Sequence, residues 1–276
     1  MWVNSRATTI RFLILLTFAI IMAFPFWYMA VVSLEPNQLS LQYPPVLFPQ
    51  HASFGNYVGA WQANNFAGYF MRSLYVSVVS TFLGTLIACA VAFVVSRYRF
   101  FGRNAIYRAF LVSMMIPGMT FLLPQFKLME TLGLLNHLYG LILIYTAGMI
   151  PFTTFLMKGF FDDIPLELED AVLMDGGSKW TLFARVAMPM ATPSLVTAVL
   201  FNFMGGWDEF TMALTFLQNP NKFTLPIALM FFQGQHSTQW GEFFAAALIQ
   251  TAPIIIMFVI FQRYIVKGIM AGAVKG

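Results

Sequence analysis

The sequence predicts an all-α integral membrane protein with six transmembrane helices, and three observations support this fold class. Of the 276 residues, 59% are hydrophobic and only 9% are charged, whereas a soluble domain carries about 25% charged residues. A globule of this composition would lack the polar surface to cover itself. Long charge-free windows recur along the chain, and the basic residues gather at one set of window ends. Most of the chain is therefore expected to face lipid.

Six windows are interpreted as spans, because a helix of about 20 apolar residues crosses a hydrocarbon core of about 30 Å. They cover residues 12–34, 73–96, 109–126, 131–157, 186–207 and 243–262. A further window, 223–241, has Pro226 near its start and a polar end, which predicts a re-entrant or interfacial segment. Residues 36–71 also lack charge but contain four prolines and several Asn and Gln residues, which predicts an external loop.

An even number of spans puts both termini on one side of the membrane, and the positive-inside rule identifies that side. Three basic residues, Arg72, Lys127 and Lys222, fall outside. The other twelve of the 15 fall inside or at inner helix ends: Arg6, Arg11, Arg97, Arg99, Arg103, Arg108, Lys158, Lys179, Arg185, Arg263, Lys267 and Lys275. We therefore expect cytoplasmic N- and C-termini and an uncleaved first span.

The remaining composition argues against several kinds of site. The single cysteine, Cys89, cannot form an internal disulfide and is expected in the core. The histidines, His51, His137 and His236, are far apart in sequence, so no metal site is expected. The basic residues are scattered between apolar runs, so topology explains them better than nucleic-acid binding does. No nucleic-acid partner is expected.

The predicted cytoplasmic segment over residues 159–189 has unusual chemistry. It concentrates six of the eleven acidic residues, Asp162, Asp163, Glu167, Glu169, Asp170 and Asp175. Pro165 suits a first helical position, and three of the acids would lie near the positive end of that helix's dipole. An apolar face follows at the spacing i, i+3, i+4 in Leu168, Ala171 and Val172.

A turn and a second helix are predicted next. Gly176 and Gly177 supply the stop, because glycine adopts positive φ without side-chain strain. Ser178 can cap a second helix that ends before Pro189. The apolar face of this helix is formed by Phe183, Val186 and Ala187. The residues alone leave two readings open, an amphipathic helix-turn-helix on the inner membrane surface and a solvated loop resting on the bundle.

The spacing in this segment resembles the EAA loop of ABC importer permeases. That motif has Glu-Ala-Ala, then Gly, then Ile-x-Leu-Pro. In the same register this chain has Asp170-Ala171-Val172, three residues, Gly176, nine residues, and Val186-Ala187-Met188-Pro189. Segments 164–178, 132–136 and 262–276, with Trp207-Asp208-Glu209-Phe210 for Trp-Asn-Glu-Phe, resemble the carbohydrate branch. The chain is thus similar to carbohydrate-type permeases of the maltose-type second-subunit class.

The resemblance implies a type I ABC importer transmembrane fold in the bacterial cytoplasmic (inner) membrane. Its parts would be a first helix with an external loop (1–68), a core (69–262) containing the coupling loop, and a cytoplasmic tail (263–276). The loop would dock in a cleft of a separate ATPase. The coupling residues carried over from the motif are Glu167, Glu169, Asp170, Ala171, Asp175, Gly176, Gly177 and Pro189.

The implied partners are a homologous second permease, a pair of ATPase subunits, an extracytoplasmic solute-binding protein, membrane lipid and a sugar substrate. The chain has no Gly-x-x-x-x-Gly-Lys-Ser/Thr run, the loop that cradles nucleotide phosphates. We therefore do not expect it to be an enzyme or to bind a cofactor itself. ATP and Mg²⁺ would be used by the partner ATPase.

Polar groups inside the membrane are costly and often functional. The candidates for a substrate pathway are Gln125, Trp207, Asp208 and Glu209. The competing interpretation is structural, with the acids satisfying backbone donors or pairing with Arg72 or Lys127. Alternatives for the whole chain are an ABC permease for a non-sugar solute and, with fewer supporting residues, a secondary transporter. An intramembrane enzyme is disfavoured, because no Cys, His or paired-acid site falls on facing spans.

Overall fold

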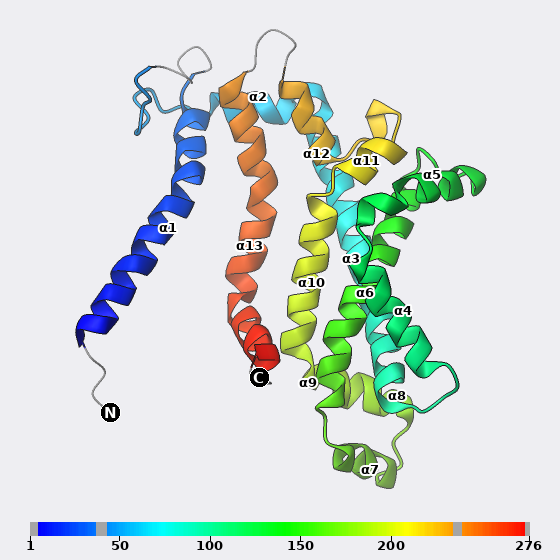
Figure 1. The fold of residues 1–276 in the computed structure, drawn as a ribbon. Coiled ribbons are helices and arrows are strands. Elements are labelled where there is room, and N and C mark those ends of the chain that lie inside the picture. The colour runs from blue at the N-terminus through cyan, green and yellow to red at the C-terminus, as the bar shows by residue number, and fades with distance from the viewer. Residues whose placement is uncertain (1–4, 37–42, 234–238, 274–276) are drawn as a thin grey trace. The chain divides into compact units, whose positions relative to one another are not determined.

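The computed structural model describes residues 5–36, 43–233 and 239–273, with the backbone alone for residues 5–7, 64 and 265–273. His236 and Lys275 lie outside the described residues, as do the side chains of Arg6 and Lys267. The described part consists of helices and connecting turns (Figure 1). It divides into two compact units, residues 1–68 with 228–252 and residues 69–227 with 253–276.

Four helices are each long and apolar enough to cross a membrane. They are α1 (Ser5–Leu34), α3 (Phe66–Arg97), α6 (Leu138–Asp162) and α13 (Trp240–Ala273). Two bent helix pairs raise the number of candidate spans to six, as predicted. Span four begins at Leu138 instead of residue 131, because residues 132–136 form a turn in which Gly133 and Asn136 have positive φ.

The predicted external loop over residues 36–71 is partly helical in its second half. It contains α2 (Gly55–Gln62) and the 3₁₀ turn η1 (Ala63–Asn65) before α3 begins. The prolines end at Pro49, so nothing prevents a helix beyond them. Asn56 and Ala60, one turn apart, form the buried face of α2.

A buried carboxylate ties this segment to the end of α1. Glu35 is only 2% exposed, and its Oε1 accepts hydrogen bonds from the backbone N–H groups of Gln50 and His51. The Asn56 amide donates to the carbonyl oxygens of Ser33 and Glu35 at 2.9 and 2.6 Å. These bonds satisfy backbone groups that are left free where the helix ends.

The third span is not one helix, contrary to prediction. It consists of α4 (Arg103–Met115), the 3₁₀ turn η2 (Gly118–Phe121) and α5 (Leu122–Thr131), with a bend of 102° between the two parts. Pro117 has no N–H to donate and disfavours helical backbone at the preceding residue. Ile116 is accordingly extended, with ψ of 125°.

The fifth span also differs from prediction. The expected second loop helix does not end before Pro189, but continues as α8 (Lys179–Thr181), a π-helical segment (Leu182–Ala187) and α9 (Met188–Met190). After a 78° bend, α10 (Thr192–Trp207) follows. The Met188 N–H bonds five residues back to Phe183, and Pro189 falls in the first turn of α9, where a missing N–H is tolerated.

The segment after residue 223, expected to be re-entrant or interfacial, is not among the helices long enough to cross a membrane in the described part of the chain. Its helical part is limited to α12 (Leu225–Ala228) and the 3₁₀ turn η5 (Leu229–Phe232). Another short helix, α11 (Thr211–Phe216), and the turn η4 (Pro220–Lys222) precede it.

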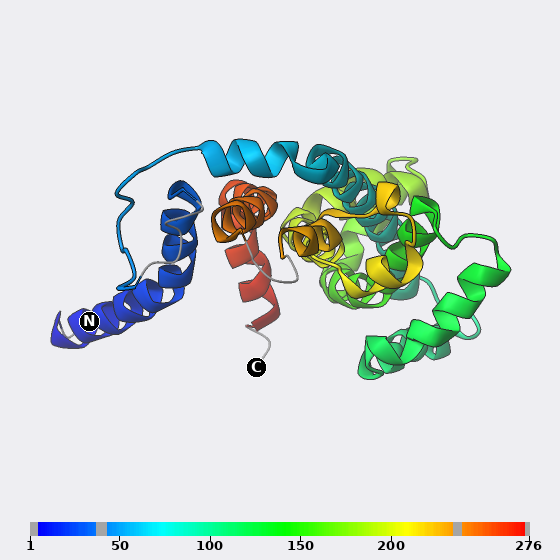
Figure 2. The same cartoon turned by 90° about the horizontal axis from the view of Figure 1, so that it is seen from above.

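Within the second unit, α3, α6 and α10 form one bundle, seen end-on in Figure 2. One apolar cluster, including Leu141, Phe216 and Ile227, lies near α11. A second, including Cys89 and Phe161, lies near α8. Cys89 is buried in the core, as expected.

The basic residues of this unit separate as predicted. Arg97 and Lys179 contact groups at the α8 end, whereas Arg72 and Lys222 donate to the carbonyl oxygens of Phe223 and Asn136 at the other end. The side of the membrane that each end faces stays a prediction.

A polar cross-link joins the three helices of the bundle. The buried Asn202 amide on α10 donates to the hydroxyl oxygens of Thr85 on α3 and Thr153 on α6, at 3.0 and 2.9 Å. In lipid, such bonds between helices add to the van der Waals packing.

Replacing Asn202 with leucine should therefore lower the free energy of unfolding by about 1 kcal/mol, because both hydroxyl groups lose their partner. Detergent-induced unfolding of the purified chain measures this. The matched change Asn221→Leu, in an exposed turn, should have a smaller effect. Equal stability of the two variants would contradict a stabilising role for the cross-link.

Candidate functional site

The turn within residues 159–189, the predicted cytoplasmic segment, depends on two glycines for different reasons. Helix α7 (Leu166–Met174) has Glu167 and Glu169 in its first turn, as predicted, and Pro165 directly before it. Gly176 has φ of +76°, which favours glycine. A Cβ on Gly177 would lie 2.6 Å from Val172 Cγ1 and 2.7 Å from its carbonyl oxygen. Neither position accepts a side chain without rearrangement.

The predicted cap on the next helix is present. Ser178 Oγ accepts from the Thr181 N–H at 3.2 Å, and the Ser178 N–H donates to Thr181 Oγ1 at 3.3 Å. This reciprocal arrangement is a capping box. It begins α8 immediately after the glycine turn and thus defines the angle between the two helices of the loop.

The second helix of the loop is anchored in the bundle. Its predicted apolar face is confirmed, since Phe183 and Ala187 are buried and Val186 packs against the same cluster. The Phe93 ring of α3 lies 5.1 Å from the Phe183 ring and 5.7 Å from the Phe161 ring of α6. Aromatic pairs at such separations add to the stabilisation from burial. The three rings therefore join α3, α6 and the π-helical segment of the loop.

Helix α7 differs, because none of its residues is buried. Of its predicted apolar face only Val172 packs against the bundle, whereas Leu168 and Ala171 are exposed, so that interpretation was too broad. The Gly177 turn brings Val172 alone against the bundle end. Exposed apolar side chains are Leu166, Leu168, Leu173, Met174 and the nearby Trp180. Together with the exposed Glu167, Asp170 and Asp175, they form a mixed surface, which we call the α7 tip.

Arg97 holds the base of the loop, a role that the sequence reasoning missed. Its Nη2 donates to the carbonyl oxygens of Phe161 and Ile164, at 2.7 and 2.6 Å. These carbonyls lie at and just after the end of α6, where a cation is favoured. In the sequence, Arg97 is the first basic residue after an apolar run, a signal we used only for topology.

Further contacts reinforce the same base. Ser96 Oγ donates to Asp162 Oδ1 at 2.6 Å, and Lys158 pairs with Oδ2 at 2.6 Å. Lys179 Nζ lies 4.5 Å from the centre of the Tyr98 ring, a cation–π contact. Burial, and then the negative charge of Glu169, raise the pKa of Tyr98 above its ordinary value. Tyr98 therefore stays neutral under physiological conditions.

A cavity of about 430 Å³ brings together two of the four pathway candidates, Gln125 and Glu209. Residues at the α4–α5 break form one wall, including Ile116 and Gly118, and α6 contributes Tyr145. The broken backbone of the third span thus lines a cavity, the setting in which irregular backbone is tolerated within a membrane.

Glu209 also has a structural role, as the competing interpretation expected. It accepts from the N–H groups of Met212 and Ala213 at 2.7 and 2.9 Å, and from the Tyr145 hydroxyl at 2.6 Å. Its carboxylate therefore stabilises the start of α11. Arg72 and Lys127, the proposed ion-pair partners, instead contact the Phe223 carbonyl and Glu130.

The other two candidates do not line this cavity. Trp207 is fully buried and packs against Phe203 and Phe70 at ring separations of 5.6 and 5.3 Å. Asp208 is exposed. Of the four candidates, only Gln125 and Glu209 line the same cavity.

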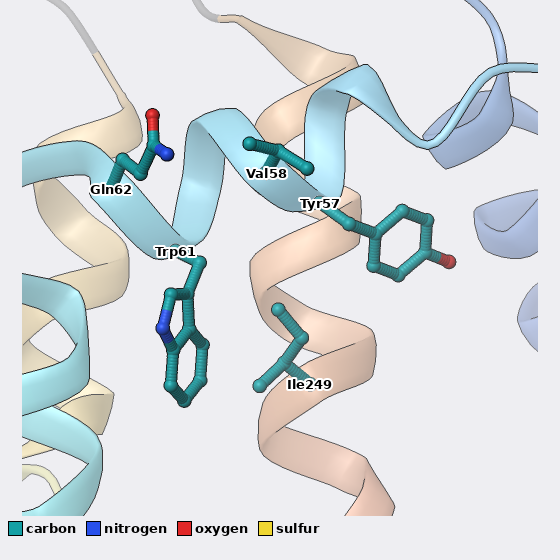
Figure 3. A pocket seen from close by; sticks show the side chains of 5 residues that line it. All are labelled: Tyr57, Val58, Trp61, Gln62 and Ile249. Atoms are coloured by element: carbon teal, nitrogen blue, oxygen red, sulfur yellow. The ribbon is translucent and has the colours of Figure 1, made fainter.

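The first unit contains a separate hollow of about 330 Å³ between α2 and α13. Tyr57, Val58, Trp61 and Gln62 line it from α2, and Ile249 from α13 (Figure 3). Its wall is mostly apolar and carries no acid–base pair. Among the described residues of the whole chain, no group of three or more His, Cys, Asp or Glu side chains could hold a metal ion.

Comparison with known proteins gives consistent matches. Residues 80–271 match the family described as binding-protein-dependent transport system inner membrane component. The trehalose/maltose transport system permease protein MalG of Thermococcus litoralis is 33% identical, over 94% of this chain and 93% of that protein. The diacetylchitobiose uptake system permease protein DasC of Streptomyces coelicolor is 32% identical, over 92% of each.

A solved structure shows the same fold. It is a crystal structure of a bacterial ABC transporter that imports the acidic polysaccharide alginate. The match has a TM-score of 0.83 and 23% identity, and it covers 96% of this chain and 99% of that chain.

The glycine turn can be tested without any partner. Gly177→Ala should destabilise the closed turn by about 1 to 3 kcal/mol, because the new methyl group overlaps Val172. Hydrogen exchange of the α7 amides should accelerate accordingly. Gly159→Ala is the matched control, since a Cβ there meets nothing within 4 Å. Unchanged exchange in Gly177→Ala would contradict the close approach.

Proposed function

Because the chain belongs to the family of binding-protein-dependent transport system inner membrane components, we propose that it is the permease subunit of an ATP-driven ABC importer. The proposed solute is a sugar or a related polyol or glycoside, which it carries across the bacterial cytoplasmic membrane. Two relatives with at least 32% identity, named for trehalose/maltose and diacetylchitobiose, support this solute class.

The α7 tip is the proposed docking surface for the ATPase, and this observation carries the proposal. It combines exposed leucines, Met174 and Trp180 with carboxylates. Exposed apolar side chains surrounded by polar ones are typical of a protein–protein interaction site. The residues proposed to couple the two subunits are Glu167, Glu169, Asp170, Ala171, Asp175, Gly176, Gly177 and Pro189. The charged members suit a positively charged rim around an apolar socket.

The base of the loop supports a coupling role as well. Movement can pass from a docked tip to the spans only if the connection is stiff. Arg97, the Phe93 aromatic contacts and the Ser178 capping box supply three independent restraints at this connection. ATP-driven closure of the ATPases would then shift the population of permease states through the loop.

The proposed complex distributes the chemistry among its subunits. This chain binds no cofactor and does not hydrolyse ATP; the ATPase pair uses ATP and Mg²⁺. A homologous second permease completes the pathway, and an extracytoplasmic solute-binding protein delivers the solute. The proposed topology has both termini in the cytoplasm. Gln125 and Glu209, which line the cavity, contact the solute, whereas Trp207 and Asp208 lie outside its lining.

Gly176→Val tests the proposal. A β-branched residue at φ of +76° costs about 1 to 2 kcal/mol and should tilt α7 out of its docking orientation. In proteoliposomes that contain the whole complex, we expect normal insertion and yield but loss of the ATPase stimulation by solute-loaded binding protein. Gly159→Val, in open space, should retain the stimulation.

Two results would overturn the proposal. One is full stimulation in Gly176→Val, which would show that the turn does not transmit the signal. The other is the absence of any ATPase that co-purifies with the unmodified chain, which would remove the energy source.

A further inference from the structure

The cavity at the α4–α5 break contains hydrogen-bond acceptors that lack a donor. Gln125 lines the cavity, and its Oε1 is buried without a hydrogen-bond partner. Pro151 has no N–H, so the carbonyl of Ala147, four residues earlier on the cavity wall, loses its usual helical donor. The Tyr145 hydroxyl, which is a donor, is already engaged by Glu209. A hydroxyl-rich solute would supply the missing donors.

The same cavity carries one negative charge and no positive one. Its source is the Glu209 carboxylate, which accepts three hydrogen bonds. All fourteen residues that line the cavity are described, and none is Lys, Arg or His. An anionic solute would therefore meet a like charge without a counter-charge, at a site partly shielded from water.

The rest of the lining is apolar and aromatic. Phe121 and Phe152 lie in the wall with Tyr145, and Met114 and Met212 add adaptable surface. Sugar rings present C–H groups on their faces, so these side chains can cover the apolar part of a sugar while the acceptors bind its hydroxyl groups. The volume of about 430 Å³ falls in the usual range for small-molecule sites.

We propose that this chain itself contains a solute-binding site in this cavity, with Gln125 and Glu209 as acceptors, and that it selects neutral polyhydroxylated solutes against anionic ones. The proposal rests on the proposed function, since it specifies the solute class of the same importer. Gln125 supplies affinity through its free carbonyl oxygen, and Glu209 supplies the charge discrimination.

Cysteine labelling in the purified complex tests this site directly. Cys89, the single native cysteine, is buried and is replaced by serine. Met114→Cys then reports on the cavity, and Met119→Cys, exposed on η2 but outside the lining, is the control. Maleimide labelling is followed with maltose, trehalose or diacetylchitobiose as neutral probes, and with glucuronate or a mannuronate disaccharide as anionic probes.

At saturation, at least one neutral probe should slow labelling of Met114→Cys by about tenfold, which corresponds to a concentration about ten times the dissociation constant. The anionic probes and the Met119→Cys position should show no protection. Gln125→Leu should remove the protection, and Gln125→Glu should keep an acceptor but not favour uronates. Glu209→Gln should let the anionic probes protect.

The outcomes separate this proposal from the one before it. Protection by uronates equal to that by neutral sugars, or no protection by any neutral probe, overturns the site. If stimulation of the ATPase by loaded binding protein persists in that case, the importer function stands. If Glu209→Gln fails to assemble because α11 loses its cap, loss of protection in Gln125→Leu at normal complex yield still decides the question.

Discussion

In a membrane, each backbone N–H and C=O group must find its partner inside the protein, because lipid offers none. This constraint accounts for the long helices α3 and α6. It also requires that the backbone groups freed at the two bends find partners within the protein or line a cavity. At the 102° bend, the freed backbone around Pro117 lines a cavity. At the 78° bend, the backbone turns into the anchored helix of the loop over residues 159–189. Both regions with a proposed function lie at these breaks.

The loop combines a stiff base with an open tip. Several contacts hold its base. The Arg97 bonds, the Ser96–Asp162 bond and the Phe93 contacts all join the end of α3 to the end of α6. Its tip exposes apolar side chains that a soluble surface would normally avoid. A stiff base keeps such a surface oriented, which lowers the entropy that docking would otherwise cost.

Local signals predicted the elements whose cause is local. The Ser178 cap, the Gly176–Gly177 turn and the long apolar windows follow from a few neighbouring residues. The effect of proline was not predictable in this way. Pro151 remains inside α6, whereas Pro117 breaks a span, so the presence of a proline does not by itself decide whether a helix continues. The partner of Glu209 is likewise Tyr145, 64 residues away, and no sequence spacing identifies such a pair.

Helix α6 connects the two regions. Tyr145 lies at the cavity and Phe161 in the loop anchor, and their separation of sixteen positions along the helix corresponds to a rise of about 24 Å. On the proposed function, a displacement of the loop base reaches the cavity wall along this one helix, without a chain of separate contacts. Pro151 interrupts its hydrogen bonding beside the cavity. On the proposed function, this helix carries the displacement from the loop base to the cavity, and its hydrogen bonding is interrupted where the proposed solute site lies.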